Sequence, residues 1–248
     1  MFFKTKTLLL FLAGSLLISA CQRAPFVHAG ASGLNTFDTS VVVADADIQA
    51  LIEPYKQKID QEMNSVIGYT GMAMNKSRPE SVLGNAMADL LVEYSNMELG
   101  KNVDLCVLNF GGLRTVLPEG DITRRKVYEL MPFDNSLVVL ELNQQEMMEL
   151  AQHILVRGGE PIGSPHGVIL NQGGFRFGSD TPINRPAYRV VTSNYLAEGG
   201  DNFAVFKRCK KREDLGVLLR DAFIIGFEKY TSPQNPLVAS IENRIELK

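Results

Sequence analysis

The feature that most constrains the fold is a short run, residues 103–109, that is apolar on both faces and is followed by paired glycines. A strand carries apolar side chains on both faces when its sheet is covered on both sides. Amphipathic helical patterns precede it at residues 45–63, around Pro54, and at residues 80–95. We therefore predict a buried central strand in a sheet with packed helices. The apolar face of the second helix is Leu83, Ala86, Met87, Leu90 and Tyr94.

The rest of the chain mixes strands and helices without a strict βαβ alternation, which favours an α+β fold with a mixed sheet. Asn143, with Glu146 three residues later, has the pattern of a capped helix start. We expect a turn at residues 120–122, a loop at 158–165 and a C-terminal helix at 215–225. We also expect strands at residues 66–74, 137–142, 167–177 and 187–193, and a helix from Thr123 to Leu130.

The N-terminus has the pattern of a secretory leader. Lys4 and Lys6 precede an apolar run at residues 8–18, which is short for a membrane span. The run ends at Cys21 in a stretch that resembles the lipobox of bacterial lipoproteins, so we expect lipidation of Cys21. The alternative is an ordinary signal peptide, or an uncleaved anchor, with Cys21 incidental. The expected organisation is a leader at 1–20, a flexible tether at 21–40 and one domain at 41–248, held at a membrane on the periplasmic or outer-membrane face of the envelope.

Charge and residue counts exclude several kinds of site. A net charge of −3 gives no basic footprint for nucleic acid. The three histidines, His28, His153 and His166, are scattered, and no metal-ligand motif is present. We therefore expect no metal, no cofactor and no catalytic residue in this chain. Cys106 has a core setting and Cys209 a solvated loop setting, and a bridge between them stays open.

Polar and aromatic residues gather where predicted strands end. Asn109, Gly111, Gly112 and Arg114 follow the buried strand, and glycines let a ligand approach the backbone closely. The alternative is a tight turn with a surface arginine. Two aromatic residues on separate loops, Phe133 and Tyr195, have the chemistry to stack on a planar base; Asp201 can accept hydrogen bonds from ribose hydroxyls. The alternative for Phe133 is a core position.

Five short motifs in fixed order resemble the C-terminal, substrate-specificity domain of the 5′-nucleotidase family. They are E-S-x-L-G-N-x-x-A-D from Glu80, N-x-G-G-x-R from Asn109, G-D-I-T from Gly120, P-F-x-N from Pro132 and N-Y-L-A-x-G-G-D-x-F from Asn194. The resemblance runs from about residue 45 to the C-terminus and implies that family's α+β fold.

The resemblance also implies residue roles. Phe133 and Tyr195 would sandwich the base, Asn109 would bind its edge, and Arg114 and Asp201 would hold the ribose, with Arg114 also near the α-phosphate. A further family arginine precedes the E-S-x-L-G-N run, and Arg78 is its candidate, displaced by one position. Phe110 and Asn202 stand where the family often has glycine, and we expect both to narrow the pocket.

In full-length relatives an N-terminal metallophosphoesterase domain supplies two metals and the catalytic histidine. The resemblance therefore implies a chain that binds a nucleoside or nucleotide and needs a separate metallophosphoesterase chain to hydrolyse it. One alternative is a non-enzymatic nucleoside-binding envelope lipoprotein. Another is a structural envelope protein with a decayed pocket.

Overall fold

The computed structural model describes residues 45–178, 181–182 and 185–247, so the predicted leader, Cys21 and tether lie outside it. The chain separates into two compact units, residues 1–51 and 52–248. The first unit contributes only residues 45–51 to the described structure.

The helices are α2 (Ala46–Met63), α3 (Val82–Leu99), η2 (Phe110–Gly112), α4 (Arg124–Leu130), α5 (Gln144–Val156), α6 (Asn194–Ala197), η3 (Gly200–Asn202), α7 (Ala204–Lys207) and α8 (Leu219–Phe227). The strands are β1 (Val66–Thr70), β2 (Leu105–Val107), β3 (Gly120–Thr123), β4 (Ser136–Leu142), β5 (Ile162–Gly163), β6 (Val168–Asn171), β7 (Gly174–Phe177), β8 (Thr181–Pro182), β9 (Tyr188–Ser193) and β10 (Lys211–Leu218).

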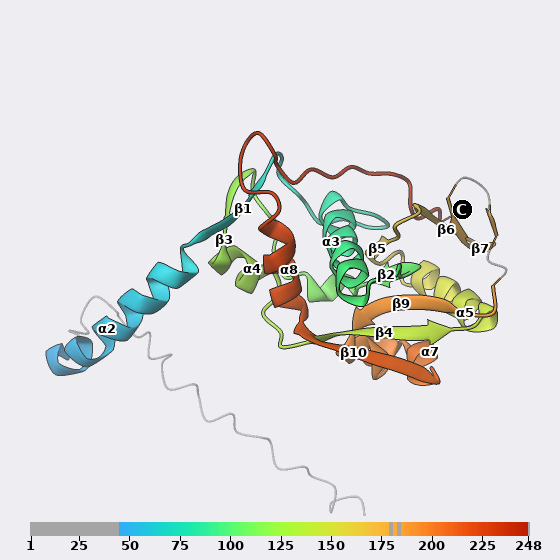
Figure 1. Cartoon of the computed structure of the whole chain (residues 1–248), viewed down its shortest axis with the longest axis horizontal. Helices are drawn as coiled ribbons and strands as arrows, with labels where there is room; N and C mark the ends of the chain where they lie inside the picture. Colours follow the sequence, from blue (N-terminus) through green and yellow to red (C-terminus); the bar gives the residue numbers. More distant parts are fainter. Residues whose placement is uncertain (1–44, 179–180, 183–184, 248) are drawn as a thin grey trace, which may run out of the picture. The chain divides into compact units, whose positions relative to one another are not determined.

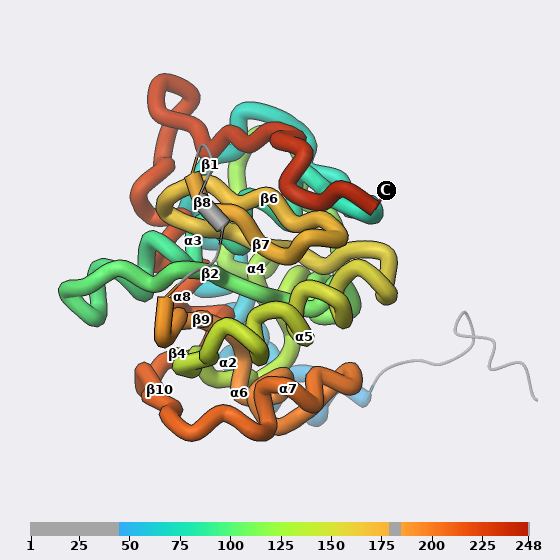
Figure 2. The backbone as a smooth tube through the Cα atoms, turned by 90° about the vertical axis from the view of Figure 1, so that its right-hand side faces the viewer, coloured from blue at the N-terminus to red at the C-terminus, as the bar shows by residue number. Residues whose placement is uncertain are grey.

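A five-stranded sheet with the order β10-β4-β9-β2-β5 is the centre of the second unit. Strand β4 pairs antiparallel with β10 and β9, β9 pairs parallel with β2, and β2 pairs antiparallel with β5. Helices α3 and α8 pack on one face and α5 and α7 on the other (Figures 1 and 2). The predicted α+β class, a mixed sheet with packed helices, is confirmed.

Strand β4 shows how the sheet is covered on both sides. Leu137 and Val139 belong to the core shared with α3 and α8, whereas Val138, Leu140 and Leu142 belong to the core shared with α5. Alternate residues of a strand face opposite sides, so both faces of β4 must be apolar. Strand β2 repeats the pattern and is buried throughout between β9 and β5, as the run at residues 103–109 predicts.

The E-S-x-L-G-N-x-x-A-D motif fixes the C-terminal segment to the start of α3. Ser81 caps α3 by accepting from the N–H of Gly84, and the Glu80 carboxylate accepts from the backbone N–H groups of residues 242 and 244 at 2.8 and 2.7 Å. Further along α3, Asp89 forms a two-point ion pair with Arg244 at 2.7 and 2.8 Å. Most polar side chains of this motif are therefore explained by packing of the chain's own end.

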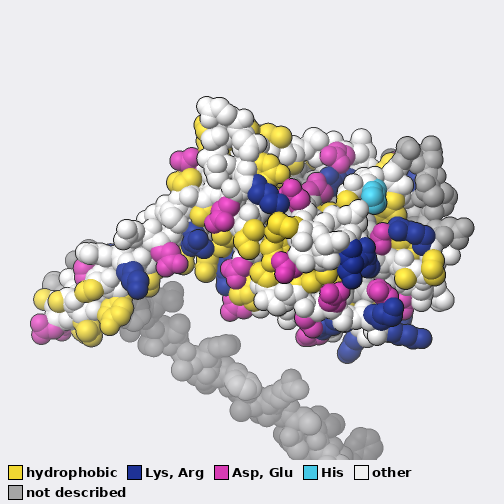
Figure 3. Space-filling view, viewed as in Figure 1, with side chains coloured by type: hydrophobic (Ala, Val, Ile, Leu, Met, Phe, Trp, Pro, Cys, Tyr) yellow, Lys and Arg dark blue, Asp and Glu magenta, His cyan; other side chains and the backbone are white. Residues whose placement is uncertain are grey.

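Helix α2 is amphipathic, as predicted, and Pro54 lies inside it. None of its residues is buried, and its apolar side chains Ile52, Tyr55 and Ile59 are exposed on its surface (Figure 3). Among the residues that the structure describes, no helix combines the length and apolar character needed to cross a bilayer.

Four local predictions were wrong. Residues 120–122 are part of strand β3, which pairs antiparallel with β1, rather than a turn. The predicted loop at 158–165 contains β5, and the predicted strand at 167–177 is the hairpin of β6 and β7. Leu215 and Leu218 lie in β10, so the C-terminal helix starts only at Leu219.

Cys106 and Cys209, the cysteines of the described part of the chain, are both free thiols. Cys106 is buried in the core as expected, and burial raises the pKa of its thiol. Cys209 is half-buried rather than solvated, because its Sγ lies 3.0 Å from the carbonyl oxygen of Glu141 and 2.9 Å from that of Lys211. Burial therefore also raises the pKa of Cys209, despite the basic residues beside it in the sequence.

Candidate functional site

The site is built where the parallel strands β2 and β9 end. Strand β2 leads into Asn109 and η2, and β9 leads into Ser193, which caps α6 and so places Tyr195. Parallel neighbours present their carboxyl ends at the same edge of a sheet, where ligands of such sheets commonly bind. Two segments far apart in the sequence therefore meet at one place.

A pocket of about 310 Å³ lies at this edge. Every residue predicted for the site except Arg78 lines it. The lining residues are Asn109, Gly111, Gly112, Arg114, Phe133, Asn135, Tyr195 and Asp201. A larger groove of about 550 Å³ runs between α3 and the C-terminal segment, but its charged residues Asp89, Glu93 and Glu242 are paired with Arg244 and Lys229.

Asn109 and Gly112 form the floor of the turn that follows β2. The amide Nδ2 of Asn109 donates to Oδ2 of Asp201 at 2.8 Å, so the turn is tied to the loop after α6. A Cβ atom on Gly112 would lie 2.6 Å from Oδ1 of Asn109, closer than such atoms approach. Glycine is needed here to keep Asn109 in place.

Phe133 and Tyr195 are the aromatic walls of the pocket. They come from the segment after α4 and from α6, and their exposed fractions are 41% and 42%. The prediction of a core Phe133 is thereby excluded, and both rings offer a face to a ligand. The ring of Tyr195 lies against Gly200, where a Cβ atom would come within 2.5 Å of it.

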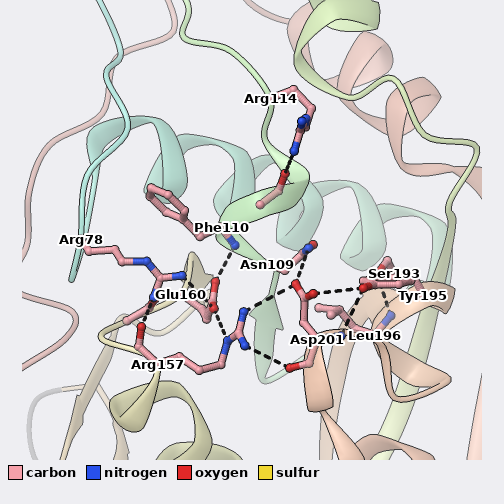
Figure 4. Close-up of polar contacts among 12 residues, drawn as sticks. Arg78, Asn109, Phe110, Arg114, Arg157, Glu160, Ser193, Tyr195, Leu196 and Asp201 are labelled. Atoms are coloured by element: carbon pink, nitrogen blue, oxygen red, sulfur yellow. Dashed lines mark hydrogen bonds and ion pairs between the residues drawn. The ribbon is translucent and has the colours of Figure 1, made fainter. Parts of the chain in front are cut away.

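Asp201 is held from several sides, as Figure 4 shows. The hydroxyl of Tyr195 lies 3.0 Å from its Oδ1, and the guanidinium of Arg157 lies 3.6 Å from its Oδ2. Its backbone is left-handed, with φ 50° and ψ 29°. Aspartate adopts this region more readily than most residues, and its neighbours must still hold it there.

Positive charge gathers beside the pocket. Arg114 donates to the carbonyl of Gly111 at 3.2 Å, and its guanidinium lies 5.9 Å from the centre of the Phe133 ring. Lys76 donates from Nζ to the carbonyl of Leu113 at 2.5 Å. Burial, and then repulsion from Arg114 and Arg78, lowers the pKa of Lys76. An anion bound among these groups would relieve that repulsion.

Arg78 does not line the pocket. Its guanidinium donates to the backbone carbonyls of Arg157 and Gly159, lies 3.2 Å from the Glu160 carboxylate, and stacks 4.6 Å from the ring centre of Phe110. Nζ of Lys76 also lies 4.0 Å from that ring centre. Phe110 is not among the residues that line the pocket and does not narrow it, contrary to expectation. Neither does Asn202, whose φ of 63° explains why glycine suits that position.

Sequence reasoning missed four residues around the pocket: Asn135, Lys76, Arg157 and Glu160. Asn135 lies in the P-F-x-N motif but was given no role. Arg157 and Glu160 flank a double glycine, Gly158-Gly159, in a segment expected to be a plain loop. Paired glycines beside charged residues marked the other site segments, so that signal was available here too.

The histidines and carboxylates of the described residues show no metal-binding cluster of three or more. His153 lies in α5 with its ring centre 4.4 Å from that of Phe203, and its Nε2 is buried without a hydrogen-bond partner. His166 lies in an exposed loop, and His28 is outside the described residues.

Comparison with known proteins agrees with this geometry. Residues 61–180 match the family model described as 5′-nucleotidase, C-terminal domain, which includes Asn109, Arg114 and Phe133 but stops before Tyr195 and Asp201. The chain is 28% identical over 218 residues to the trifunctional nucleotide phosphoesterase protein YfkN of Bacillus subtilis, covering 79% of this chain and 15% of that protein. It is 25% identical over 244 residues to the 5′-nucleotidase of Homo sapiens, covering 84% and 41%.

Solved structures of 5′-nucleotidases are also similar to this chain. The 5′-nucleotidase precursor of Thermus thermophilus superposes with a TM-score of 0.62 at 26% identity, over 80% of this chain and 42% of that one. The chain spans between 15% and 41% of the length of the curated relatives above. The mixed sheet, the ordered motifs and these matches together show that the chain carries a 5′-nucleotidase C-terminal domain.

Proposed function

We propose that the pocket binds a nucleoside or nucleotide, as the specificity domain of a 5′-nucleotidase-type hydrolase in nucleotide catabolism. The observation that carries this proposal is the pair Phe133 and Tyr195, two half-exposed aromatic side chains on separate loops that line one pocket. Stacking of a base on an aromatic side chain is worth about 1–3 kcal/mol. The pocket volume of about 310 Å³ lies in the range of small-ligand sites.

The polar residues suit the remaining parts of a nucleotide. Each carboxylate oxygen of Asp201 has accepted one close protein hydrogen bond, from Tyr195 or Asn109, and retains a further lone pair for a ribose hydroxyl. Arg114 and the neighbouring Lys76 offer cationic donors for a phosphate. Hydrophobic walls with a few convergent polar groups are typical of a specific small-molecule site.

Hydrolysis, in this proposal, requires a metallophosphoesterase on a separate chain. The metals of that chain would polarise the phosphate and activate water. The residues of this chain would bind and orient the base and ribose. Such a division places substrate binding energy in one polypeptide and charge stabilisation in the other. The names of the relatives, a nucleotide phosphoesterase and 5′-nucleotidases, support this reaction class.

Membrane attachment through Cys21 is the second part of the proposal. The lipobox-like sequence would place the chain on a membrane face of the envelope, and a phosphoesterase on the same surface would meet it in two dimensions. Mass spectrometry of the protein purified from its own membranes tests this part. A diacylglyceryl adduct on Cys21 as the new N-terminus is expected, and an unmodified Cys21 would contradict it.

Phosphate release from AMP tests the catalytic part. The purified chain, a metallophosphoesterase from the same membranes, and their mixture are each assayed with Mn²⁺ or Zn²⁺. We expect release from the mixture that depends on Phe133 and Tyr195. Strong AMP hydrolysis by this chain alone would contradict the division of labour.

A non-enzymatic nucleoside-binding lipoprotein is the second candidate, and one observation favours it. The pocket of this chain supplies two aromatic side chains, an arginine and a carboxylate, and this candidate assigns nucleoside binding to them alone. Binding of adenosine without hydrolysis in any mixture would select this candidate.

A further inference from the structure

Arg157 contacts both the backbone and the side chain of Asp201 (Figure 4). Its Nη1 donates to the carbonyl oxygen of Asp201 at 3.2 Å, and its Nη2 lies 3.6 Å from Oδ2. Arg157 is not among the residues that line the pocket. Its direct contact with a pocket-lining residue is the one with Asp201.

Glu160 fixes Arg157 from the other side. Its side chain is fully buried and accepts from Nε of Arg157 at 2.6 Å, from Nη2 of Arg78 at 3.2 Å and from the backbone N–H of Phe110 at 2.5 Å. A buried carboxylate is tolerated only when its oxygens are paired in this way. The planar guanidinium of Arg157 thus has one edge on Glu160 and the other on Asp201.

This arrangement ties the two loops of the pocket to one buried group. The N–H of Phe110 begins η2 directly after Asn109, and Asp201 lies in η3. Asp201 is left-handed, with φ 50°, so the direction of its carboxylate depends on contacts that hold its backbone. Arg157 supplies such a contact at the Asp201 carbonyl.

We propose that Arg157, held by Glu160, is a positioning residue that orients Asp201 and thereby sets recognition of the ribose hydroxyls. This inference rests on the proposed nucleoside pocket and names residues to which neither the motifs nor the resemblance assigns a role. It predicts a defect confined to ligands whose hydroxyls Asp201 can bind. Base stacking on Phe133 and Tyr195 stays intact.

Calorimetric titration with adenosine and 2′,3′-dideoxyadenosine tests this inference. In Arg157→Gln we expect the Kd of adenosine to rise about ten-fold or more, the scale of one charge-assisted hydrogen bond. The Kd of dideoxyadenosine should stay within about two-fold. Arg208→Gln is the matched control, because Arg208 forms an ion pair with exposed Glu149 in α5, the helix that Arg157 ends. Both Kd values should be unchanged in this variant.

A double-mutant cycle shows whether Arg157 acts through Asp201. If it does, Arg157→Gln combined with Asp201→Asn binds adenosine no more weakly than Asp201→Asn alone. Additive losses, or an equal loss of dideoxyadenosine binding in Arg157→Gln, would overturn the positioning role while leaving the pocket in place. Failure of the unsubstituted protein to bind either ligand would instead remove the proposed function, and this inference with it.

Substitution of Glu160 itself separates positioning from folding. Glu160→Gln keeps the shape but removes the charge between two arginines, so thermal unfolding is recorded alongside binding. If Glu160→Gln remains folded, we expect the same selective loss of adenosine binding as in Arg157→Gln. A folded Glu160→Gln variant with unchanged adenosine binding would contradict the role of Glu160.

Discussion

The hydroxyl of Tyr195 is bonded to Asp201 at two points: it lies 3.0 Å from Oδ1 and accepts the backbone N–H of Asp201 at 3.2 Å. One aromatic residue therefore both forms a wall of the pocket and holds the carboxylate beside it. The ring and the hydroxyl of Tyr195 thus have different roles, and a substitution can remove the hydroxyl while keeping the ring.

Tyr195→Phe should affect ribose binding alone. The ring and its stacking face remain, whereas Asp201 loses one hydrogen bond worth about 0.5–1.5 kcal/mol. We expect adenosine to bind about three- to ten-fold more weakly and dideoxyadenosine to bind as before. Tyr195→Ala is the comparison, and it should weaken both ligands by about 1–3 kcal/mol. Equal effects of Tyr195→Phe on the two ligands, measured by calorimetry, would refute the hydroxyl's role.

Gly112→Ala should damage the pocket more than Gly111→Ala. A Cβ atom at Gly112 would meet Oδ1 of Asn109 at 2.6 Å and displace the side chain that donates to Asp201, whereas at Gly111 the nearest atom is 3.9 Å away. We expect adenosine affinity to fall about ten-fold further in Gly112→Ala, because a charge-assisted hydrogen bond is lost. Similar Kd values for the two variants, or a higher Kd for Gly111→Ala than for Gly112→Ala, would count against this geometry.

Asp89→Ala should destabilise the fold without changing the site. The variant leaves the buried side chain of Arg244 with Glu242 as its carboxylate partner and the carbonyl of Ile162 as a hydrogen-bond acceptor, and it loosens the C-terminal segment. We expect a loss of about 1–3 kcal/mol in the free energy of unfolding, measured in urea. Asp214→Ala, which breaks an exposed pair with Arg212, should cost less than about 0.5 kcal/mol. Undiminished stability with weakened adenosine binding would mean that this motif serves the ligand instead.

Stability should decline as the pH falls below about 6.5, in part because of His153. Burial, and then Arg157, lowers the pKa of His153 from its usual 6.5, against the opposing effects of Asp201 and Glu160. The unfolded chain therefore takes up a proton on His153 at a higher pH than the folded chain does. The free energy of unfolding falls as the pH is lowered from the unfolded pKa to the folded pKa. Urea unfolding at several pH values should show a shallower decline in His153→Gln. His166→Gln, in an exposed loop, is the control, and an unchanged decline in His153→Gln would refute the assignment.

Local sequence patterns were sufficient to predict elements that are determined by interactions between residues close together in the sequence. The helix start at Asn143 has both hydrogen bonds of a capping box with Glu146, and Thr123 caps α4 as its position predicts. Strand β2 was predictable because an apolar run on both faces fits only the inside of a covered sheet. Strand ends with glycine and polar residues marked candidate binding positions, and the resemblance to the 5′-nucleotidase family supplied the proposed roles of the residues there.

Long-range pairing was not visible in the sequence. Strand β3 has a turn-like sequence and becomes a strand only through its pairing with β1. Strand β10 begins with four charged residues, which suits an exposed edge and hides it from a search for apolar alternation. The double glycine between Arg157 and Glu160 marked their segment, but their contacts join residues up to 82 positions apart, so no local pattern could reveal their partners.

Binding of adenosine to this chain alone tests the central claim most directly. Calorimetry should show saturable binding by the unsubstituted protein, and ligand at 100 times its Kd should add about 2.7 kcal/mol to stability. The variant with Phe133→Ala and Tyr195→Ala should lose that binding while keeping its melting temperature, because both side chains are half-exposed and neither belongs to the hydrophobic core. Absence of binding to adenosine and AMP, or equal binding by the doubly substituted protein, would contradict the account.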